Sequence, residues 1–566
     1  MSLKKTYTTL EMNATTSVVL VVLLLIVVNV LSSKVYKRFD LTKEKRYSIS
    51  NASKEVMKDL DDIVYVKVYL EGEFPAGFVR LQNATRDLLN EMKAYAGSNL
   101  RYEFIDPLNV DNAEERKQIF DELTAKGLQP TNLQVKANDA YEERIIFPAA
   151  LIYHKGREYP IQLLENQIGF SPDAALNNSV ISLEYKFANA IQKLKRQKQP
   201  AIAFLEGHGE LKGLQIADMV GTLRELKYDV SRINIKDQYK IPDRIDLAIC
   251  AKPREAFSEK DLFILDQFVM RGGKMIWLFE SVKAEMDSLR QKQMFIALNQ
   301  ELNLENLLFK YGVRINYDLI QNLELVNPIP LIVGNQTQLF PWFYFPLLIS
   351  EGDHAISKNL DPVEGKFVSS IDTIKNGIKK TVLLTSSNYS RAILTPARIH
   401  LGLLREKPSH ELFNKKKLPV AVLLEGKFES FYKNYLDASF LQVIDTSDAL
   451  DYREESDLNK MIVISDGDMI ANEVRSNGSV YPLGYYKYTE QTFANKDFLI
   501  NCIEYLLDDS GIIETRTKEI KLRLLDKVKV KEEKLMWQLL NVLLPLVILL
   551  IFGFAFNYRR KFLYNR

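Results

Sequence analysis

Two carboxylates and a histidine alternate in one short segment of the sequence, FLEGHGE at residues 204–210. Glu206 and Glu210 are residue types that perform acid–base chemistry, and His208 could carry a proton between them. The same three side chains could also bind a metal ion as alternate ligands on an extended loop. However, no serine or cysteine stands beside them as a nucleophile, and no further histidine completes a ligand set.

The position of this segment leaves two other interpretations open. It ends the apolar run 201–206, which predicts a buried strand, and precedes a helix predicted over 211–227. Loops at this point of an open α/β sheet bind ligands, and backbone amides before a helix can hold an anion. His208 and Glu210 could equally cap the helix within a structural turn. The structural turn is the favoured interpretation, and Glu206, His208 and Glu210 are candidates for contact with a ligand or partner; we expect no catalytic residue and no metal.

The surrounding pattern predicts a doubly wound sheet of parallel strands over residues 200–300 and 411–510. Strands and helices alternate strictly here, which places helices on both faces of a parallel sheet. Strands are predicted at 201–206, 228–235, 246–253 and 274–280, with helices at 211–227 and 258–273. Apolar runs at 418–426 and 460–468 and a helix at 495–509 are expected to extend the same sheet.

Residues 301–410 are expected to form an inserted subdomain. It contains an aromatic run between two prolines, LFPWFYFP at 339–346. Trp342 and Tyr344 could stack on a sugar or contact a partner, or the run could pack as a buried corner.

An N-terminal α/β domain is expected over residues 40–180. Strands are predicted at 62–70 and 102–108, a helix at 78–95, and a strand pair within 145–161 that is entered through Pro148. This order resembles thioredoxin-like domains, with Pro148 where that fold carries its cis-proline. No cysteine precedes Cys250, so the redox motif is missing and the domain would bind or scaffold. A generic α/β domain is the alternative; a linker helix over 181–199 follows.

Composition excludes several classes of protein. Lys and Arg total 75 against 73 for Asp and Glu, a formal net charge of +2, so no basic field indicates nucleic acid. The two cysteines, Cys250 and Cys502, lie in apolar runs; we expect buried free thiols, although one disulfide stays possible. The only Gly-Gly-Lys precedes a predicted strand instead of forming a phosphate-binding loop. We expect no cofactor and no ATPase activity.

Apolar runs near both ends predict two membrane helices, at 16–32 and 536–557. The first could instead be a signal peptide, but no small-residue cleavage pattern follows it. Arg559, Arg560 and Lys561 follow the second run, which places the tail 558–566 in the cytoplasm by the positive-inside rule. Two spans return residues 1–15 to the cytoplasm. The bulk of the chain, with a juxtamembrane segment at 511–535, is then periplasmic on the bacterial inner membrane.

The order of several segments strongly resembles GldG, a gliding-motility-associated ABC transporter auxiliary family. These segments are RFDLTKEKRYSIS, FLEGHGE, DQFVMRGGKMIWLFE, LLFKYGVRINYDLI, LFPWFYFPLL, NKDFLINCIEYLLDDSG and KEIKLRLLD. The resemblance implies a substrate-binding-like subunit that works with a multi-span ABC permease subunit and a cytoplasmic ATPase subunit. It also implies a link to gliding motility and protein secretion. For the parallel-sheet domain, the resemblance implies a relation to amidotransferase-like folds.

Two functions from different classes follow. The favoured one is a non-enzymatic, membrane-anchored component of an ABC transporter complex that binds a partner or substrate through its external domains. The alternative is an envelope hydrolase that acts on glycan or peptide through Glu206, His208 and Glu210.

Overall fold

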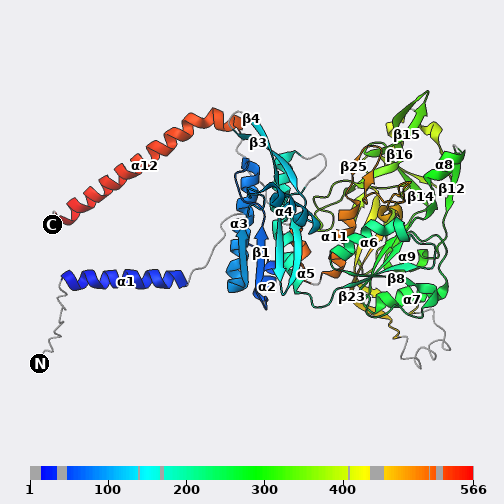
Figure 1. Cartoon of the computed structure of the whole chain (residues 1–566), viewed down its shortest axis with the longest axis horizontal. Coiled ribbons are helices and arrows are strands. Elements are labelled where there is room, and N and C mark those ends of the chain that lie inside the picture. Colours follow the sequence, from blue (N-terminus) through cyan, green and yellow to red (C-terminus); the bar gives the residue numbers. More distant parts are fainter. Residues whose placement is uncertain are drawn as a thin grey trace. The chain divides into compact units, whose positions relative to one another are not determined.

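The structure is a computed structural model of the whole chain (Figure 1). It describes residues 14–34, 48–137, 140–165, 171–292, 294–405, 408–433, 451–508, 510–517 and 527–564. The chain divides into two compact units, Met1–Lys518 and Glu519–Arg566. The predicted cytoplasmic segment 1–15 and the juxtamembrane segment 511–535 lie partly outside the described residues.

The second unit is one long helix, α12 (Lys527–Tyr564), of 38 residues. At about 1.5 Å per residue it is roughly 57 Å long, nearly twice the ~30 Å of a bilayer core. Its part Lys529–Leu563 is the one helix among the described residues that is long and apolar enough to cross a membrane. This confirms the predicted C-terminal apolar helix and suggests membrane association.

The N-terminal apolar run also forms a helix, α1 (Ala14–Lys34). Its described apolar part, Val18–Asn29, is shorter than the ~20 residues that a full span needs. A second span at 16–32 therefore stays a prediction.

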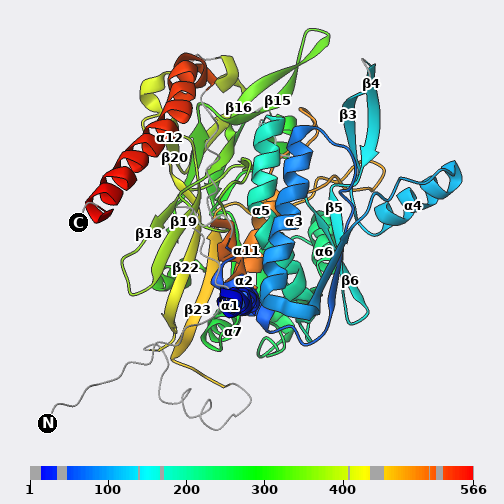
Figure 2. The same ribbon diagram turned by 90° about the vertical axis from the view of Figure 1, so that its left-hand side faces the viewer.

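The N-terminal domain is built on a four-stranded sheet in the order β2-β1-β5-β6. Its strands are β1 (Val64–Val68), β2 (Leu100–Phe104), β5 (Ala149–His154) and β6 (Arg157–Gln162). β1 and β2 are parallel, whereas β5 is antiparallel to both β1 and β6. The helices α3 (Ala76–Ala96) and α5 (Pro172–Lys195) lie side by side along the domain (Figure 2).

The predicted strands and helix of this domain are present, but one detail is wrong. The peptide bond before Pro148 is trans, and the cis bond of the described chain lies at Thr395–Pro396. The local sequence shows that a proline begins the strand, but it does not show whether the preceding peptide bond is cis or trans, because the surrounding packing selects the isomer. The thioredoxin-like assignment stays a prediction. The domain also contains α2 (Asn51–Lys58), α4 (Ala113–Ala125), β3 (Thr131–Ala137) and β4 (Ala140–Ile146).

The central sheet has ten strands, and half of it is parallel as expected. The parallel strands, in spatial order, are β8 (Asp229–Asn234), β7 (Ala201–Glu206), β9 (Leu247–Ala251), β10 (Lys274–Leu278) and β23 (Glu455–Ile464). Beyond β23 the sheet continues antiparallel through β22 (Pro419–Glu429), β19 (Lys379–Thr385), β16 (Gln336–Ser350) and β15 (Val326–Val333), with β17 (Val363–Glu364) beside β16.

Two expectations differ from this sheet. The run at 418–426 is a strand of the sheet, but it pairs antiparallel with β23, so the sheet is not wholly parallel. Strands β15, β16 and β19 come from residues 301–410 and extend the main sheet, which the sequence did not predict; an inserted subdomain over that segment stays a prediction. The reason is that an apolar run predicts burial, whereas strand direction depends on the connections.

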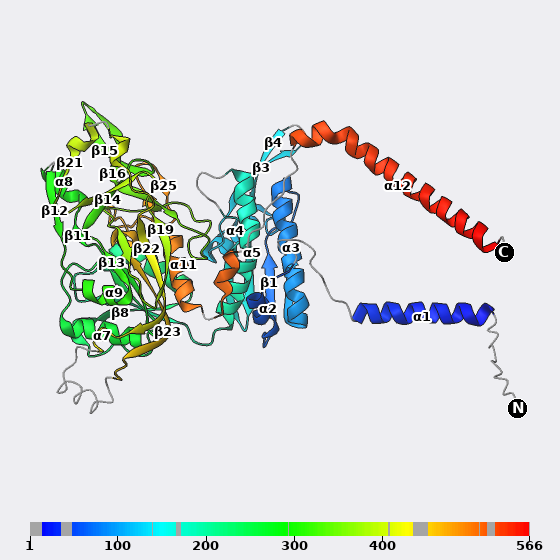
Figure 3. The same ribbon diagram turned by 180° about the vertical axis from the view of Figure 1, so that it is seen from behind.

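Helices cover both faces of the central sheet, as predicted. α6 (Ala217–Glu225) and α11 (Asn495–Leu507) share a core with Ile202 and Phe204 of β7. The neighbouring residues Ala203 and Leu205 face the other core, with α7 (Glu259–Met270) and α9 (Glu305–Tyr311). Figure 3 shows α7 and α9 on one side of β22 and β23 and α11 on the other.

The beginning and the end of the first unit meet. The short 3-10 helix η7 (Ile512–Thr517) packs against α2 and α5. Lys193 of α5 donates to Glu504 of α11 at 2.5 Å, and both side chains are buried. The seam between the N-terminal domain and the central sheet is therefore a packed contact.

The smaller strands and helices complete the first unit. They are β11 (Val282–Lys283), α8 (Met286–Lys292), β12 (Met294–Asn299), β13 (Val313–Ile315), β14 (Asp318–Asn322), β18 (Ile371–Thr373), β20 (Ser390–Leu394), β21 (Ala397–His400), β24 (Tyr485–Tyr486) and β25 (Gln491–Thr492).

Candidate functional site

Polar side chains gather where the parallel strands end. His208 follows β7, Lys252 follows β9, Glu280 follows β10, and Asp466 and Asp468 follow β23. Because these strands are parallel neighbours, their carboxyl ends lie at one edge of the sheet. This is the edge at which open α/β sheets bind ligands.

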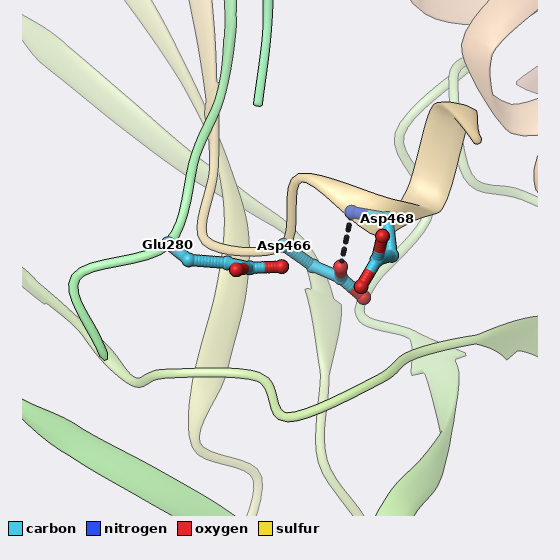
Figure 4. Close-up of side chains that lie close together, drawn as sticks. All are labelled: Glu280, Asp466 and Asp468. Carbon is cyan, nitrogen blue, oxygen red and sulfur yellow. Dashed lines mark hydrogen bonds between the residues drawn. The ribbon is translucent and has the colours of Figure 1, made fainter. Parts of the chain in front are cut away.

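Three carboxyl side chains, Glu280, Asp466 and Asp468, lie close together here (Figure 4), and with Lys252 they form what we call the carboxylate–lysine cluster. The Lys252 ammonium lies 3.0 Å from Glu280 Oε1 and 2.6 Å from Asp468 Oδ1. The Asp468 amide donates to Asp466 Oδ1 at 2.8 Å. Glu280, Asp466 and Lys252 are buried, so their charges interact with little screening by water.

A close backbone approach holds this cluster together. Lys252 has a positive φ of 52° and lies against Gly467 in the loop after β23. A Cβ on Gly467 would lie 2.6 Å from Lys252 Cγ and 3.1 Å from Lys252 Cα. Only glycine therefore fits at position 467 without displacing Lys252.

The acidic groups of the cluster differ in proton affinity. Burial raises the pKa of Glu280 well above its usual value, and the charge of Asp468 adds to this rise. Burial and then Asp468 raise the pKa of Asp466 to about 7. Burial also opposes the charge of Asp468, but contact with Lys252 outweighs it and lowers the pKa of Asp468. The cluster thus holds one ionised pair, Lys252 with Asp468, beside two carboxyl groups that favour the protonated form.

The cluster's donor atoms could suit a hard cation. One carboxylate oxygen from each of Glu280, Asp466 and Asp468 lies within 4.8 Å of the others, and oxygen ligands are what Mg²⁺ and Ca²⁺ prefer. The Lys252 ammonium, however, already contacts two of the three carboxylates. Charge balance is therefore supplied by a lysine, and the arrangement is that of a buried ion-pair network.

The chain also covers this edge with a segment of its own, residues 363–370. The Lys366 amide donates to Asp466 Oδ2 at 2.9 Å, and the Ser369 amide donates to the Ser465 carbonyl at 3.3 Å. Ser465 Oγ donates back to the Ser369 carbonyl at 2.5 Å. The place where other α/β sheets admit a ligand is thus lined by internal hydrogen bonds.

His208 is fully buried beside this edge, between two carboxylates. Its Nε2 lies 3.1 Å from Asp261 Oδ2, and its Nδ1 lies 3.4 Å from Glu210 Oε1. Its ring stacks on Phe257 with centroids 3.8 Å apart. Burial opposes ionisation of Asp261, but hydrogen bonds from Ser258 and His208 outweigh it and lower its pKa.

The loop around His208 is tied to the protein by its backbone. The His208 carbonyl accepts hydrogen bonds from the amides of Arg254 at 2.7 Å and Glu255 at 2.9 Å. The His208 amide donates to Glu210 Oε2 at 2.6 Å. Glu206 is separate from this arrangement, half-buried beside Arg232 at 3.6 Å. The structure therefore brings His208 and Glu210 together in a buried turn, where they contact each other and Asp261; the helix that follows, α6, has no side-chain cap at its N-cap residue Ile216.

Trp342 and Tyr344 do not form an exposed aromatic surface. Both lie in β16 and are buried, at 0% and 2% exposure, in a core shared with Phe367. This matches the packed-corner alternative. Cys250 and Cys502 are buried free thiols, as expected, and burial raises the pKa of both.

Comparison with known proteins gives two family matches. A family model described as an ABC-type uncharacterized transport system matches residues 199–502. A second model, described as a domain of unknown function, matches residues 43–153.

Two individual proteins are also similar. An uncharacterized protein of Borreliella burgdorferi is 20% identical over 536 residues, which cover 93% of this chain and 94% of that protein. A solved structure described as the mmIFT52 N-terminal domain is 12% identical, with a TM-score of 0.31; the match covers 55% of this chain and 98% of that one.

Proposed function

Because its residues 199–502 match that model, the chain belongs to the ABC-type uncharacterized transport system family, and we propose that it is a non-enzymatic auxiliary component of an ABC transporter complex. The family match, which spans the whole central sheet, is the observation that carries this proposal. The partners are then other components of the transporter.

The contacts at the sheet edge support the non-enzymatic part of this proposal. His208 is buried between Glu210 and Asp261, with no exposed ring nitrogen to exchange a proton with a substrate. The carboxylate–lysine cluster is neutralised internally and covered by residues 363–370. The nearest cysteine at that edge, Cys250, is buried with a raised pKa, which disfavours the reactive thiolate.

The finer assignments rest on the sequence. The resemblance to the GldG family supports a complex with a multi-span permease and a cytoplasmic ATPase, linked to gliding motility and protein secretion. The basic residues after the apolar part of α12, Arg559, Arg560 and Lys561, support a cytoplasmic tail in the inner membrane. The first unit would then lie in the periplasm and bind a partner or substrate there.

The test is recovery of the complex from native membranes. The full chain, carrying an affinity tag, is purified in a mild detergent, and its companions are identified by mass spectrometry. We expect a multi-span permease and an ABC ATPase in constant proportion to the tagged chain.

A tagged single-span protein of the same membrane, at equal abundance, is the control for non-specific recovery. Repeated purification of the chain alone, or equal recovery of the ATPase with the control, would contradict the proposal.

A further inference from the structure

A cleft of about 260 Å³ lies at the seam between the N-terminal domain and the central sheet. Three separate parts of the chain line it: strand β6, the C-terminal end of α5, and the turn between α6 and β8. Its volume is below the ~300–1,000 Å³ of common ligand pockets, so only a compact ligand fits.

The lining of this seam cleft is strongly cationic. Arg157, Lys193, Arg196 and Lys227 line it, with Glu158 as the one carboxylate among its lining residues. A second carboxylate, Glu504, lies against Lys193 at 2.5 Å. Four cations against two carboxylates leave two formal positive charges. A partly enclosed site of this kind attracts an anion more strongly than an open surface does.

Two of these cations are engaged in the fold. Lys193 is neutralised by Glu504, which raises its pKa against the opposing effect of burial. Arg157 donates to the carbonyls of Arg196, at 3.0 Å, and Leu194, so it stabilises the end of α5.

The other two cations retain donors for a ligand. Arg196 donates one hydrogen bond from its guanidinium, to the Leu507 carbonyl at 3.3 Å, and a guanidinium has five N–H groups. Lys227 is exposed, and no carboxylate of the described residues pairs with it. Arg196 and Lys227 come from opposite sides of the seam. A basic residue at the C-terminal end of α5 stabilises that helix, which explains the presence of Arg196 but not that of Lys227.

Two tyrosines complete the lining. Tyr159 and Tyr228 are buried, and the Lys193 ammonium lies 5.4 Å and 5.6 Å from their ring centroids. Burial raises the pKa of Tyr228 to about 12, so its hydroxyl is neutral at physiological pH. A neutral phenol can donate a hydrogen bond to an anion without repelling it.

From this geometry we propose that the seam cleft binds a small anion carrying a phosphate or carboxylate group, held by Arg196 and Lys227 beside Tyr228. The proposal is independent of the transport role. It assigns a ligand site at the contact between two domains, so binding there would also stabilise the seam.

The test measures the thermal unfolding midpoint of the full chain in detergent. Pyrophosphate is the probe for a phosphate ligand and citrate the probe for a carboxylate ligand. Each is compared with a sample in which sodium chloride gives the same ionic strength. We expect a saturable rise in the midpoint with at least one probe. Which probe acts distinguishes a phosphate ligand from a carboxylate ligand.

The double variant Lys227→Asn/Arg196→Gln should bind the active probe about 10- to 100-fold more weakly, as expected for lost charge-assisted hydrogen bonds. Asparagine suits position 227 because Lys227 has a positive φ of 64°. The matched control is Lys198→Gln, which removes an exposed charge two positions beyond Arg196, from a side chain that does not line the cleft. If the double variant folds poorly, Lys227→Asn alone decides, because that side chain is exposed.

Three results would overturn the proposal. They are no saturable rise with either probe, an unchanged affinity in the variant, or an equal loss in the Lys198→Gln control. A rise that the control keeps and the variant loses supports it.

Discussion

Single residues at the sheet edge act through buried contacts. The His208 ring touches Phe257, Asp261 and Glu210 at once. Removing the ring would take one contact from each of Glu210 and Asp261, which keep their hydrogen bonds from the residue 208 amide and from Ser258, and it would leave a cavity against Phe257. Such losses affect stability before they affect any reaction.

We therefore predict that His208→Ala lowers the free energy of unfolding by about 2–5 kcal/mol. Chemical denaturation of the purified chain measures it, with cellular abundance as a second readout. Glu206→Ala is the matched control in the same loop; its half-buried side chain pairs only loosely with Arg232, so we expect a change within about 0.5 kcal/mol. If His208→Ala leaves the unfolding curve unchanged but abolishes the phenotype, the stability role is wrong and a catalytic role of this loop is favoured.

Glu280 gives the carboxylate–lysine cluster a pH dependence. Its raised pKa means that the folded chain keeps this proton above the usual value of 4.5, where the unfolded chain has lost it. The wild type therefore loses stability as the pH rises above about 4.5, and Glu280→Gln does not share that loss. We expect the stability advantage of the wild type over Glu280→Gln to shrink between about pH 5 and pH 8.

Unfolding midpoints of both proteins across this pH range measure the effect. Lys252→Met is the contrasting variant: it takes the nearest cation from the partly exposed Asp468 carboxylate, and we expect it to cost about 1–3 kcal/mol. A difference between wild type and Glu280→Gln that grows with pH would show that Glu280 is ionised in the folded chain.

At this scale the sequence predicts only what is local. Glu206, His208 and Glu210 are visible as candidates because they are neighbours in the chain. Asp261, which contacts His208, is 53 positions away, and Lys252 meets Asp468 across 216 positions. A usable signal did exist, since Lys252, Glu280 and Asp466 each lie among the last three residues of a run predicted to form a strand of this sheet.

At the scale of elements, helices α5 and α11 are joined by a buried network. Glu504 of α11 accepts hydrogen bonds from Lys193, at 2.5 Å, from Asn189, at 3.2 Å, and from the Tyr185 hydroxyl. Burial disfavours the Glu504 charge, but Lys193 outweighs it and lowers its pKa. The two helices thus depend on one carboxylate.

We predict that Glu504→Ala destabilises the chain by about 3–5 kcal/mol, because it leaves the Lys193 ammonium buried without a counter-ion. The apolar double variant Lys193→Met/Glu504→Leu should recover much of this loss, since it removes both charges together. Thermal unfolding of the three proteins provides the comparison. A double variant no more stable than Glu504→Ala would mean that the hydrogen bonds to Tyr185 and Asn189 matter more than charge.

The sequence predicts where strands and helices lie in the chain better than it predicts whether neighbouring strands run parallel or antiparallel. The strands β7, β8, β9 and β10 and the helix α7 lie where periodicity and the Ser258 cap place them. The antiparallel direction of β22 and the entry of β16 into the same sheet depend on long connections, for which no local pattern exists.

At the scale of the whole molecule, the compartment of the first unit is the main expectation to test. Ser476 is exposed in a turn, whereas Cys250 and Cys502 are buried. We predict that Ser476→Cys reacts with a membrane-impermeant maleimide in cells whose outer membrane is permeabilised and whose inner membrane is intact. The unmodified sequence is the matched control, because its thiols are inaccessible while folded. Labelling of Ser476→Cys only after inner-membrane lysis would place the unit in the cytoplasm.

The contacts of η7 with α2 and α5 determine how a pulling force would be transmitted through the folded part of the chain. The described fold begins at residue 48 and ends at residue 517, and these two terminal regions lie against the same helix. A pulling force applied at both ends of this body would pass from α2 through α5 to η7. It would not load the strands of the ten-stranded sheet. The short base formed by α2, α5 and η7 would then bear the pull.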